Sequence, residues 1–397
     1  MAEGRPRRVA VVYGTPAGVG GLGLHVGIVI AALARAGHEV HAVGPGHAGG
    51  WPLSGIEVDV KWTATGRRAW LSAAGWTPLR WYPGIQAQYT DTLTGRWAAR
   101  QLDRIRPDAV YFFTQVALEG LDWCRTHGVP SILDNPNGSI ANFQAVCERE
   151  WSYWCGGRHR GHPTGAMVAR VLEEYRLADH IRVSSTWAMA STAKELANPT
   201  KISIVDQPLD LSRFRPPRAR QASTDLHVVY VGSIDVRKGV LRLLRAVRMA
   251  NFSAPVRITL VGGTGSRGMH SALRRETAGL NVVVAPGDPV PAYHAADVLV
   301  LPTLEDGFGF VVAEAMACAL PVVVTDQSGA AEWVREAAAG WVVPAADEKA
   351  LESALDDAIV NKAQLRMMGV RGRDYVDVRA GDRCFAALQA LVGSVTN

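Results

Sequence analysis

A loop with two carboxylates and two glycines precedes a predicted helix in the segment 301–325. The carboxylates are Glu305 and Asp306, the glycines are Gly307 and Gly309, and the apolar runs on either side are typical of buried parallel strands. Glycine permits positive φ and lets a ligand approach the backbone closely. The first turn of the helix directs unpaired N–H groups and the positive end of its dipole toward the loop. An anion, most commonly a phosphate group, is therefore the expected ligand.

A basic pair, Arg237 and Lys238, stands in a second loop before a predicted helix. The loop follows an apolar strand predicted over 226–232 and ends at Gly239. Point charges beside a helix N-terminus strengthen the same kind of anion site. A solvated surface pair is the alternative, but lysine is rare in this chain, so we favour anion binding.

A glycine-rich loop over residues 14–23 contains Gly18, Gly20 and Gly23 at the spacing of the dinucleotide fingerprint. A nicotinamide-binding unit carries an acid near the end of its second strand to hold the ribose. Here the second predicted strand ends in the apolar and glycine residues 42–45, so the dinucleotide interpretation is weak. A loop that contacts a donor phosphate and a tight turn without a ligand are the remaining interpretations.

The segment Asp306-Gly-Phe-Gly-Phe-Val-Val-Ala-Glu314 resembles the E-x(7)-E element of retaining glycosyltransferases of family 4, which have the GT-B fold. The first predicted strand–helix–strand unit, with Gly20-Gly21, is similar to the first unit of that family. The resemblance covers nearly the whole chain and is densest over 172–335. It implies an α/β protein with two Rossmann-like domains that face each other across a cleft.

The resemblance also implies a role for each matching residue. In the family, the first acid and the following Gly-Phe-Gly amides hold the donor sugar, the second acid holds the ribose, and a lysine clamps the diphosphate. Two positions depart from the family pattern: Asp306 replaces a glutamate and Ser233 an arginine, with Glu305 and Arg237 as the expected substitutes. The residues expected to carry catalysis are Lys238, Arg237, Asp306 and Glu314. The residues expected to bind the donor are Gly20, Gly21, Ser233, Glu305, Gly307, Phe308, Gly309, Phe310 and Val311.

The acceptor side is predicted less directly. Asp134 and Asn135 follow a predicted strand, at the end where open α/β sheets place ligands. Many family members have a histidine near this point, which is absent here, and His162 is a further candidate. A turn-forming role for the Asn-Pro-Asn-Gly segment is the alternative. Trp76 and Trp81 belong to an aromatic segment that could stack on an acceptor, sit at a membrane interface or form core.

A chain of 397 residues exceeds what one hydrophobic core usually serves, so two domains are expected. We predict an N-terminal acceptor-side domain over 1–207, a linker over 208–224 and a nucleotide-sugar-binding domain over 225–378. The resemblance implies that a final helix, 379–397, packs back on the first domain.

Composition excludes several other classes of protein. The net charge is +5, no basic run has interleaved aromatic residues, and nucleic acid is therefore not an expected partner. No apolar run is long enough to span a membrane and no cleavable leader is apparent, so we expect a cytoplasmic location. The five cysteines are scattered and form no C-x-x-C pair, which argues against disulfides and a zinc site.

The function implied by the resemblance is retaining, metal-independent transfer of a sugar from a nucleoside diphosphate sugar to an acceptor hydroxyl. The nucleotide sugar is a co-substrate, and no cofactor or metal is expected. The acceptor could be a small molecule, a glycan or a lipid-linked molecule, with peripheral membrane contact. The alternatives are a nucleotide-sugar-binding protein with little turnover, a NAD-dependent dehydrogenase, and a GT-B epimerase or phosphorylase.

Overall fold

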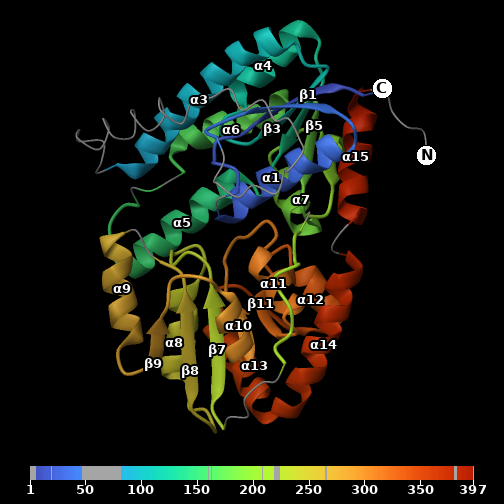
Figure 1. Ribbon diagram of the computed structural model, residues 1–397. Coiled ribbons are helices and arrows are strands. Elements are labelled where there is room, and N and C mark those ends of the chain that lie inside the picture. The colour runs from blue at the N-terminus through green and yellow to red at the C-terminus, as the bar shows by residue number, and fades with distance from the viewer. Residues whose placement is uncertain are drawn as a thin grey trace. The chain divides into compact units, whose positions relative to one another are not determined.

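The chain forms two compact units (Figure 1). The computed structural model describes residues 6–18, 20–46, 82–159, 161, 163–207, 209–218, 224–263, 266–379 and 382–396. The first unit comprises Met1–Gln144, Arg160–Leu209 and Asp382–Asn397. The second unit comprises Ala145–His159 and Asp210–Gly381.

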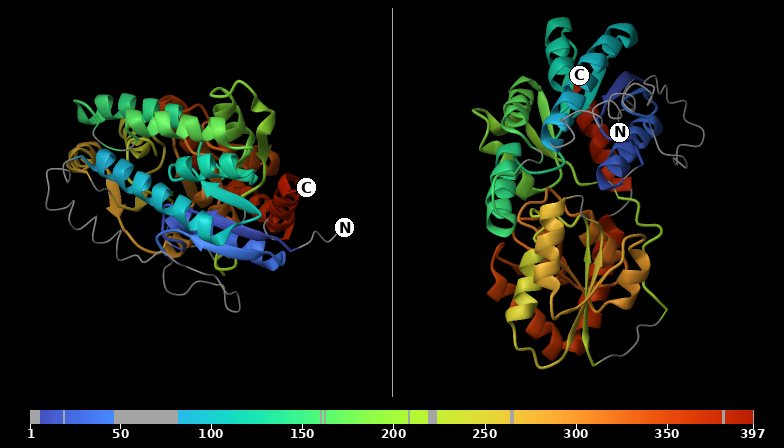
Figure 2. Two further views of the ribbon diagram at one scale, coloured as in Figure 1. Left: turned by 90° about the horizontal axis from the view of Figure 1, so that it is seen from above. Right: turned by 90° about the vertical axis from the view of Figure 1, so that its left-hand side faces the viewer.

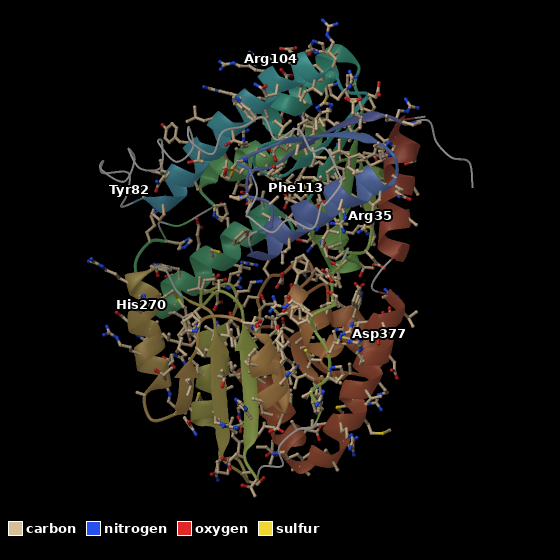
Figure 3. All side chains as sticks on the ribbon, in the orientation of Figure 1. Arg35, Tyr82, Arg104, Phe113, His270 and Asp377 are labelled. Atoms are coloured by element: carbon tan, nitrogen blue, oxygen red, sulfur yellow. The ribbon has the colours of Figure 1, made fainter. Side chains whose placement is uncertain are left out.

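The first unit is built on a parallel sheet of six strands in the order β2-β1-β3-β4-β5-β6. Its strands are β1 (Arg8–Val12), β2 (Glu39–Val43), β3 (Ala109–Phe113), β4 (Ser131–Asp134), β5 (His180–Val183) and β6 (Ile202–Ile204). Its helices are α1 (Gly20–Arg35), α3 (Pro83–Ile105), α4 (Leu118–His127), α5 (Ile140–Cys155), α6 (Gly165–Leu177), α7 (Thr186–Ala193), the short η2 (Pro199–Lys201) and α15 (Asp382–Thr396). Because helices cover both faces of a parallel sheet, its strands are mainly apolar, and the central strand β3 is apolar along its whole length. Phe113, at the end of β3, lies in this interior (Figure 3).

The second unit has the same architecture, with the strand order β12-β11-β10-β7-β8-β9. Its strands are β7 (Leu226–Val231), β8 (Val256–Val261), β9 (Asn281–Val284), β10 (Val298–Leu301), β11 (Val322–Thr325) and β12 (Gly340–Val343). Its helices are α8 (Val240–Met249), α9 (Arg267–Thr277), α10 (Val290–Ala295), α11 (Phe310–Ala317), α12 (Ala331–Ala337), α13 (Glu348–Val360) and α14 (Lys362–Arg379). Helices lie on both faces of this sheet as well (Figure 2). The predicted pair of Rossmann-like α/β units is confirmed.

Two segments join a unit that is distant from them in sequence. The final helix α15 packs against α1, where Leu388, Leu391 and Val392 share a buried cluster with Val26 and Val29. Most of α5, from Ala145 onward, belongs to the second unit, although we predicted the first domain to run without interruption from 1 to 207.

Each sheet has a point at which the direction of strand addition reverses. In the first unit this point lies between β1 and β3, and in the second unit it lies between β7 and β10. Open α/β sheets bind ligands at such points, beyond the carboxyl ends of the strands. The loops after these four strands are therefore the places to look for a site.

Candidate functional site

The loops after β7 and β10 meet at the reversal point of the second unit. The Leu304 amide donates a hydrogen bond to the Arg237 carbonyl oxygen at 2.9 Å. A Cβ added to Gly239 would lie only 1.9 Å from the Pro302 oxygen, and Gly239 itself has a φ of 69°. Glycine is thus required where the two loops approach each other. The fold brings the basic pair and the acidic pair together across 68 positions of sequence.

Lys238 and Asp306 form an ion pair at this junction. The Lys238 Nζ lies 2.5 Å from the Asp306 Oδ2, and the two side chains are 15% and 12% exposed. The Lys238 amide donates to the Asp235 Oδ1 at 3.0 Å, which fixes the backbone beneath the ammonium group. The ammonium group is therefore already positioned beside the loop that leads into α11.

Arg237 and Glu305 form a second, deeper pair. The Arg237 Nη1 donates to the Glu305 carbonyl oxygen at 2.7 Å and to its Oε2 at 2.9 Å, and the Glu305 side chain is fully buried. Burial alone would lower the pKa of Arg237, but the charges of Glu305, Asp235 and Asp306 raise it, so the guanidinium stays charged. These two predicted donor-binding side chains hold each other and fix the loop on which Asp306 stands.

The N-terminus of α11 follows this loop directly. Gly309 occupies the N-cap with a φ of 86°, and no described side chain caps the helix there. The preceding Phe308 is buried, with its ring centroid 4.9 Å from that of Trp333, and its carbonyl oxygen accepts from the Ala330 amide. The loop is thus anchored by its aromatic side chain, and the first helical amides, from Phe310 onward, head α11 without a side-chain cap.

Glu314 lies one turn further along α11 and is largely buried. The Tyr293 hydroxyl donates to its Oε2 at 2.7 Å. Burial raises the pKa of Glu314, although Tyr293 and Arg213 act in the opposite direction. A buried carboxylate with one hydroxyl donor has further capacity to accept hydrogen bonds, for example from the hydroxyls of a ribose.

Two side chains at this junction were not predicted from the sequence. Asp235 accepts from the Ser233 hydroxyl at 2.5 Å and from the Lys238 amide, and its place three residues before a basic residue at a helix start is a signal that could have identified it. Tyr293 lies on α10, and no motif there points to Glu314. The Ser233 hydroxyl donates to Asp235, so the Ser233 side chain stabilises the loop itself.

The glycine loop of the first unit adopts a tight turn. The Gly18 amide donates to the Gly23 oxygen at 2.8 Å, and a Cβ on Gly23 would lie 2.3 Å from the Pro16 oxygen. Gly20 has a φ of 63° and, with Gly21, begins α1 at the surface of the unit. The glycines are explained by this turn geometry, and the phosphate contact predicted for Gly20 and Gly21 stays a prediction.

The two described candidates for acceptor binding lie inside the first unit. Asp134 is fully buried and accepts from His25 and Tyr111, and Asn135 is 3% exposed and donates to the Thr192 hydroxyl at 2.9 Å. The polar groups of Asp134 and Asn135 thus form hydrogen bonds with other buried residues of the first unit. A histidine does lie close to Asp134, but it comes from α1. His162, Trp76 and Trp81 lie outside the described residues.

No group of three or more histidine, cysteine, aspartate and glutamate side chains could hold a metal ion in the described part of the chain. Within that same part, no helix combines the length and apolar character needed to cross a bilayer. Cys124, Cys147 and Cys318 are buried free thiols and Cys155 is half-buried.

Comparison with known proteins shows what the chain is similar to. Residues 225–361 match the family described as Glycosyl transferases group 1. The chain is 30% identical over 193 residues to the D-inositol 3-phosphate glycosyltransferase of Segniliparus rotundus, a match covering 44% of this chain and 43% of that protein. It is 28% identical over 222 residues to a GDP-mannose-dependent phosphatidylinositol monomannoside mannosyltransferase of Mycolicibacterium smegmatis, covering 50% and 57%. The chain thus spans about half the length of these curated relatives.

Solved structures resemble the whole chain. The sucrose-phosphate synthase of Thermosynechococcus elongatus superposes with a TM-score of 0.70 at 18% identity, covering 98% of both chains. HepE of Anabaena, solved in complex with UDP-glucose, superposes with a TM-score of 0.67 at 15% identity, again covering 98% of both. At this identity the likeness establishes the fold. Residues 225–361 therefore resemble the glycosyl transferases group 1 family, and the chain as a whole has the GT-B fold.

Proposed function

We propose that this protein transfers a sugar, with retention and without a metal ion, from a nucleoside diphosphate sugar to an acceptor hydroxyl. The observation that carries the proposal is the junction at the reversal point of the second unit. There Lys238 is paired with Asp306 in space, Asp306 stands in the loop that leads into the N-terminus of α11, and Glu314 lies on that helix. The Lys238 ammonium group and the N-terminus of α11 suit a diphosphate, the Asp306 carboxylate suits sugar hydroxyls, and the Glu314 carboxylate suits a ribose.

The chemistry follows from where charge develops. As the bond between the sugar and the β-phosphate breaks, its electron pair passes to the phosphate oxygen. The positioned Lys238 ammonium and the α11 dipole stabilise this charge without reorganising. The acceptor oxygen forms the new bond to the sugar, and its proton passes to the departing phosphate. Asp306, now paired with Lys238, would turn to a donor-sugar hydroxyl.

The names of the similar proteins support a nucleotide-sugar donor. One curated relative is named as GDP-mannose-dependent, and one structural neighbour is described with UDP-glucose. For this chain, the donor class is part of the proposal. The cytoplasmic location, the acceptor and any membrane contact expected from the sequence stay predictions.

A nucleotide-sugar-binding protein with little turnover is the second candidate, since Asp306 and Ser233 depart from the usual residues. Such a protein would be stabilised by nucleotide sugars and would release no product. The dehydrogenase interpretation lacks support, because the glycines of its fingerprint are accounted for by the turn.

The test is the variant Lys238→Ala. Removing one preorganised charge donor should lower kcat by about a hundred- to a thousand-fold. Turnover of the best donor, chosen by thermal shift with UDP-, GDP- and ADP-sugars, gives the rate, and circular dichroism shows whether the fold is kept.

Lys349→Ala, which removes an exposed lysine at the start of α13 in the same unit, is the matched control and should retain the parent rate. Near-normal turnover by the Lys238 variant would refute the charge clamp. Nucleotide-sugar binding without any product in the parent protein would favour the second candidate.

A further inference from the structure

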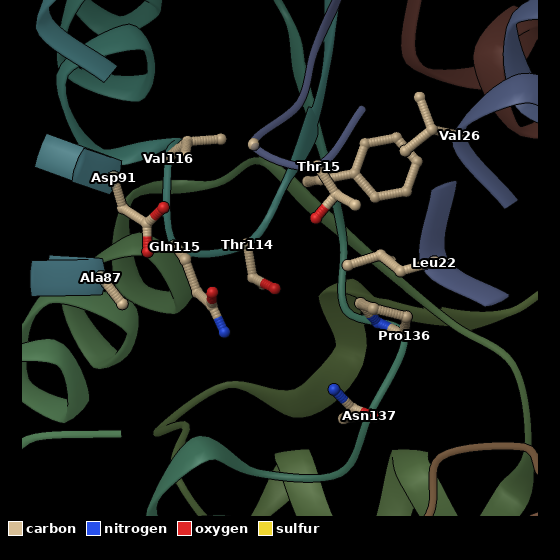
Figure 4. A pocket seen from close by; sticks show the side chains of 12 residues that line it. Thr15, Leu22, Val26, Ala87, Asp91, Thr114, Gln115, Val116, Pro136 and Asn137 are labelled. Atoms are coloured by element: carbon tan, nitrogen blue, oxygen red, sulfur yellow. The ribbon is translucent and has the colours of Figure 1, made fainter. Parts of the chain in front are cut away.

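The loops at the two reversal points are held in different ways. In the first unit, residues of the loops after β1 and β3, among them Thr15 and Thr114, line a pocket of about 210 Å³ (Figure 4). In the second unit, the loop after β10 carries Phe308, whose side chain is only 2% exposed. The position of this second loop therefore depends on the residues that surround the Phe308 ring.

A chain of ring contacts connects Phe308 with three helices. The Phe308 ring centroid lies 5.9 Å from that of Phe310, at the start of α11, with an interplanar angle of 78°. It lies 4.9 Å from the centroid of Trp333 on α12, at 80°. The Trp333 centroid in turn lies 5.8 Å from that of Tyr375 on α14, at 64°. Edge-to-face packing of this kind is favourable, because the positive edge of one ring meets the negative face of the next.

The backbone of the loop is hydrogen-bonded to the segment that leads into α12. The Asp306 amide donates to the Gln327 oxygen at 3.0 Å, and the Asp306 oxygen accepts from the Gly329 amide at 3.0 Å. The Phe308 oxygen accepts from the Ala330 amide at 2.7 Å. The helix that supplies the tryptophan is thus tied to the loop by its preceding backbone as well as by the ring contact.

Residues of α14 hold Trp333 in place. The Trp333 side chain is 3% exposed, and the Arg379 guanidinium lies 5.7 Å from its ring centroid and 5.0 Å from that of Tyr375. The Tyr375 hydroxyl and the Arg379 Nη2 both donate to the Glu336 Oε2, the latter at 3.0 Å. The indole ring is therefore fixed between the loop and α14.

We propose that Trp333 is a positioning residue of the donor site, which acts through the Phe308 ring on the Asp306 carboxylate and on the first amides of α11. The inference rests on the proposed function and adds a residue to it, since no motif in the sequence pointed to Trp333. Because the tryptophan is buried, it acts through its neighbours and does not bind the donor itself.

The expected consequence of losing this contact is a slower reaction with nearly unchanged donor binding. Groups aimed at a developing charge must be placed accurately, and a displacement of about 1 Å can cost roughly a hundred-fold in rate. Trp333→Leu keeps apolar bulk and removes the ring contact, so kcat should fall by about ten- to a hundred-fold. The donor KM should change by less than about threefold, because the Lys238 backbone and the Glu314 side chain are held by partners outside this chain of rings.

Two further variants test whether the effect passes through Phe308. Trp333→Phe keeps an aromatic ring beside Phe308 and should restore kcat to within about threefold of the parent value. Phe308→Leu should lower kcat as Trp333→Leu does, and the double leucine variant should be no slower than either single one, because the two rings act as a unit. Additive losses in the double variant would contradict the inference.

Trp154→Leu is the matched control. Trp154 is equally buried, at 3% exposed, and belongs to the core of the same unit among β7, β8 and α8. The substitution should lower the free energy of unfolding and leave kcat per folded molecule unchanged, with the folded share measured by circular dichroism. An equal loss of kcat in Trp333→Leu and Trp154→Leu would show a structural role only, and a parent-like kcat in Trp333→Leu would also overturn the inference.

Tryptophan fluorescence decides the matter if Trp333→Leu does not fold. A donor that engages Asp306 should shift the Phe308 ring and change the emission of the adjacent indole. Most of the change in emission that the best nucleotide sugar causes in the parent should therefore be lost in Trp333→Phe. A response of the same size in Trp333→Phe would contradict the coupling between the tryptophan and the loop.

The parent protein separates this inference from the proposed function. A parent that neither binds a nucleotide sugar nor forms a product refutes the proposed function, and the role of Trp333 is refuted with it. A parent that turns over its donor, with Trp333→Leu equally fast, refutes only the role of Trp333 and leaves the transferase standing.

Discussion

Glu314, which we propose as a ribose-binding residue, carries a carboxyl group whose burial bears on stability. Burial raises the pKa of its carboxyl above the ordinary value of 4.5. A raised pKa in the folded state means that the contribution of this group to stability is greatest below the ordinary value and is lost as pH rises through the folded-state value. When it is ionised, the buried carboxylate therefore lowers the free energy of unfolding of the empty protein, and hydrogen bonds from ribose hydroxyls would offset this loss.

The variant Glu314→Gln tests this interpretation. It removes the buried charge and keeps an oxygen that can accept from Tyr293, so the free energy of unfolding should stay equal or rise by up to about 1 kcal/mol. Affinity for the nucleotide should fall about tenfold, because a hydrogen bond to a charged group is lost. Urea unfolding near neutral pH and calorimetric titration with UDP and GDP measure the two effects.

Glu352→Gln on α13 is the control and should change neither quantity. A Glu314 variant that loses stability and keeps its nucleotide affinity would show that the carboxylate has a structural role only.

At the scale of elements, a buried polar cluster joins three strands and a helix of the first unit. Asp134 ends β4, and it accepts from Tyr111 on β3 at 2.5 Å, from His25 on α1 at 2.7 Å and from Arg182 on β5 at 3.2 Å. Arg182 also donates to the Val205 oxygen at 2.6 Å, just beyond β6. The cluster thus fixes the segment through which the chain leaves the unit.

Asp134→Asn should destabilise the first unit by about 3–5 kcal/mol, because it leaves the buried Arg182 without a charged partner. Burial alone would raise the pKa of Asp134, but its interactions with His25, Arg182 and Tyr111 lower it to about 2. A lowered pKa contributes stability that is present above the ordinary value of 3.8 and is lost as pH falls through the folded-state value.

The difference in unfolding free energy between the parent and Asp134→Asn should therefore be largest near neutral pH and shrink in acid. Urea unfolding at a series of pH values measures it. A difference that is constant with pH would show that the carboxylate is not the ionised partner of Arg182.

The elements themselves were predictable, and the partners of their polar residues were not. Apolar runs such as 8–13 and 297–302 indicate buried parallel strands because their environment is apolar on both faces. Asp134 was predicted as a ligand contact because it ends a strand. Its actual partners, His25 and Arg182, lie 109 and 48 positions away in the sequence, and only the sheet order brings them together.

At the scale of the whole molecule, the core of the second unit includes residues of α5, which precedes most of that unit in the sequence. Trp154, in the last turn of α5, is 3% exposed and belongs to the same buried cluster as residues of β7, β8 and α8. Its Nε1 donates to the Glu150 Oε2 at 3.2 Å, and the Arg242 Nη2 donates to that same oxygen at 2.9 Å. The Arg245 guanidinium lies 4.0 Å from the ring centroid.

The sequence could predict two units, because the length and the repeated strand–helix pattern require them. It could not predict that the end of α5 packs in the core of the second unit. The helix is one continuous pattern, and nothing local marks where its packing partners change. The residues predicted for a donor site stand in short motifs, because loops after strands carry their chemistry there. Lys238 and Asp306 are paired in the structure, and their role in donor binding stays a prediction.

Trp154→Ala should therefore destabilise the second unit selectively, by about 3–5 kcal/mol for a large buried side chain, although the residue precedes most of that unit in sequence. Hydrogen exchange measured by mass spectrometry should show faster exchange in peptides of β7 and β8 and unchanged exchange in those of β1 and β3. Trp123→Ala on α4, which packs against the core of the first unit, should give the reverse pattern. Faster exchange in β1 and β3 on loss of Trp154 would place this part of α5 with the first unit, and the division of the chain into its two units would have to be redrawn.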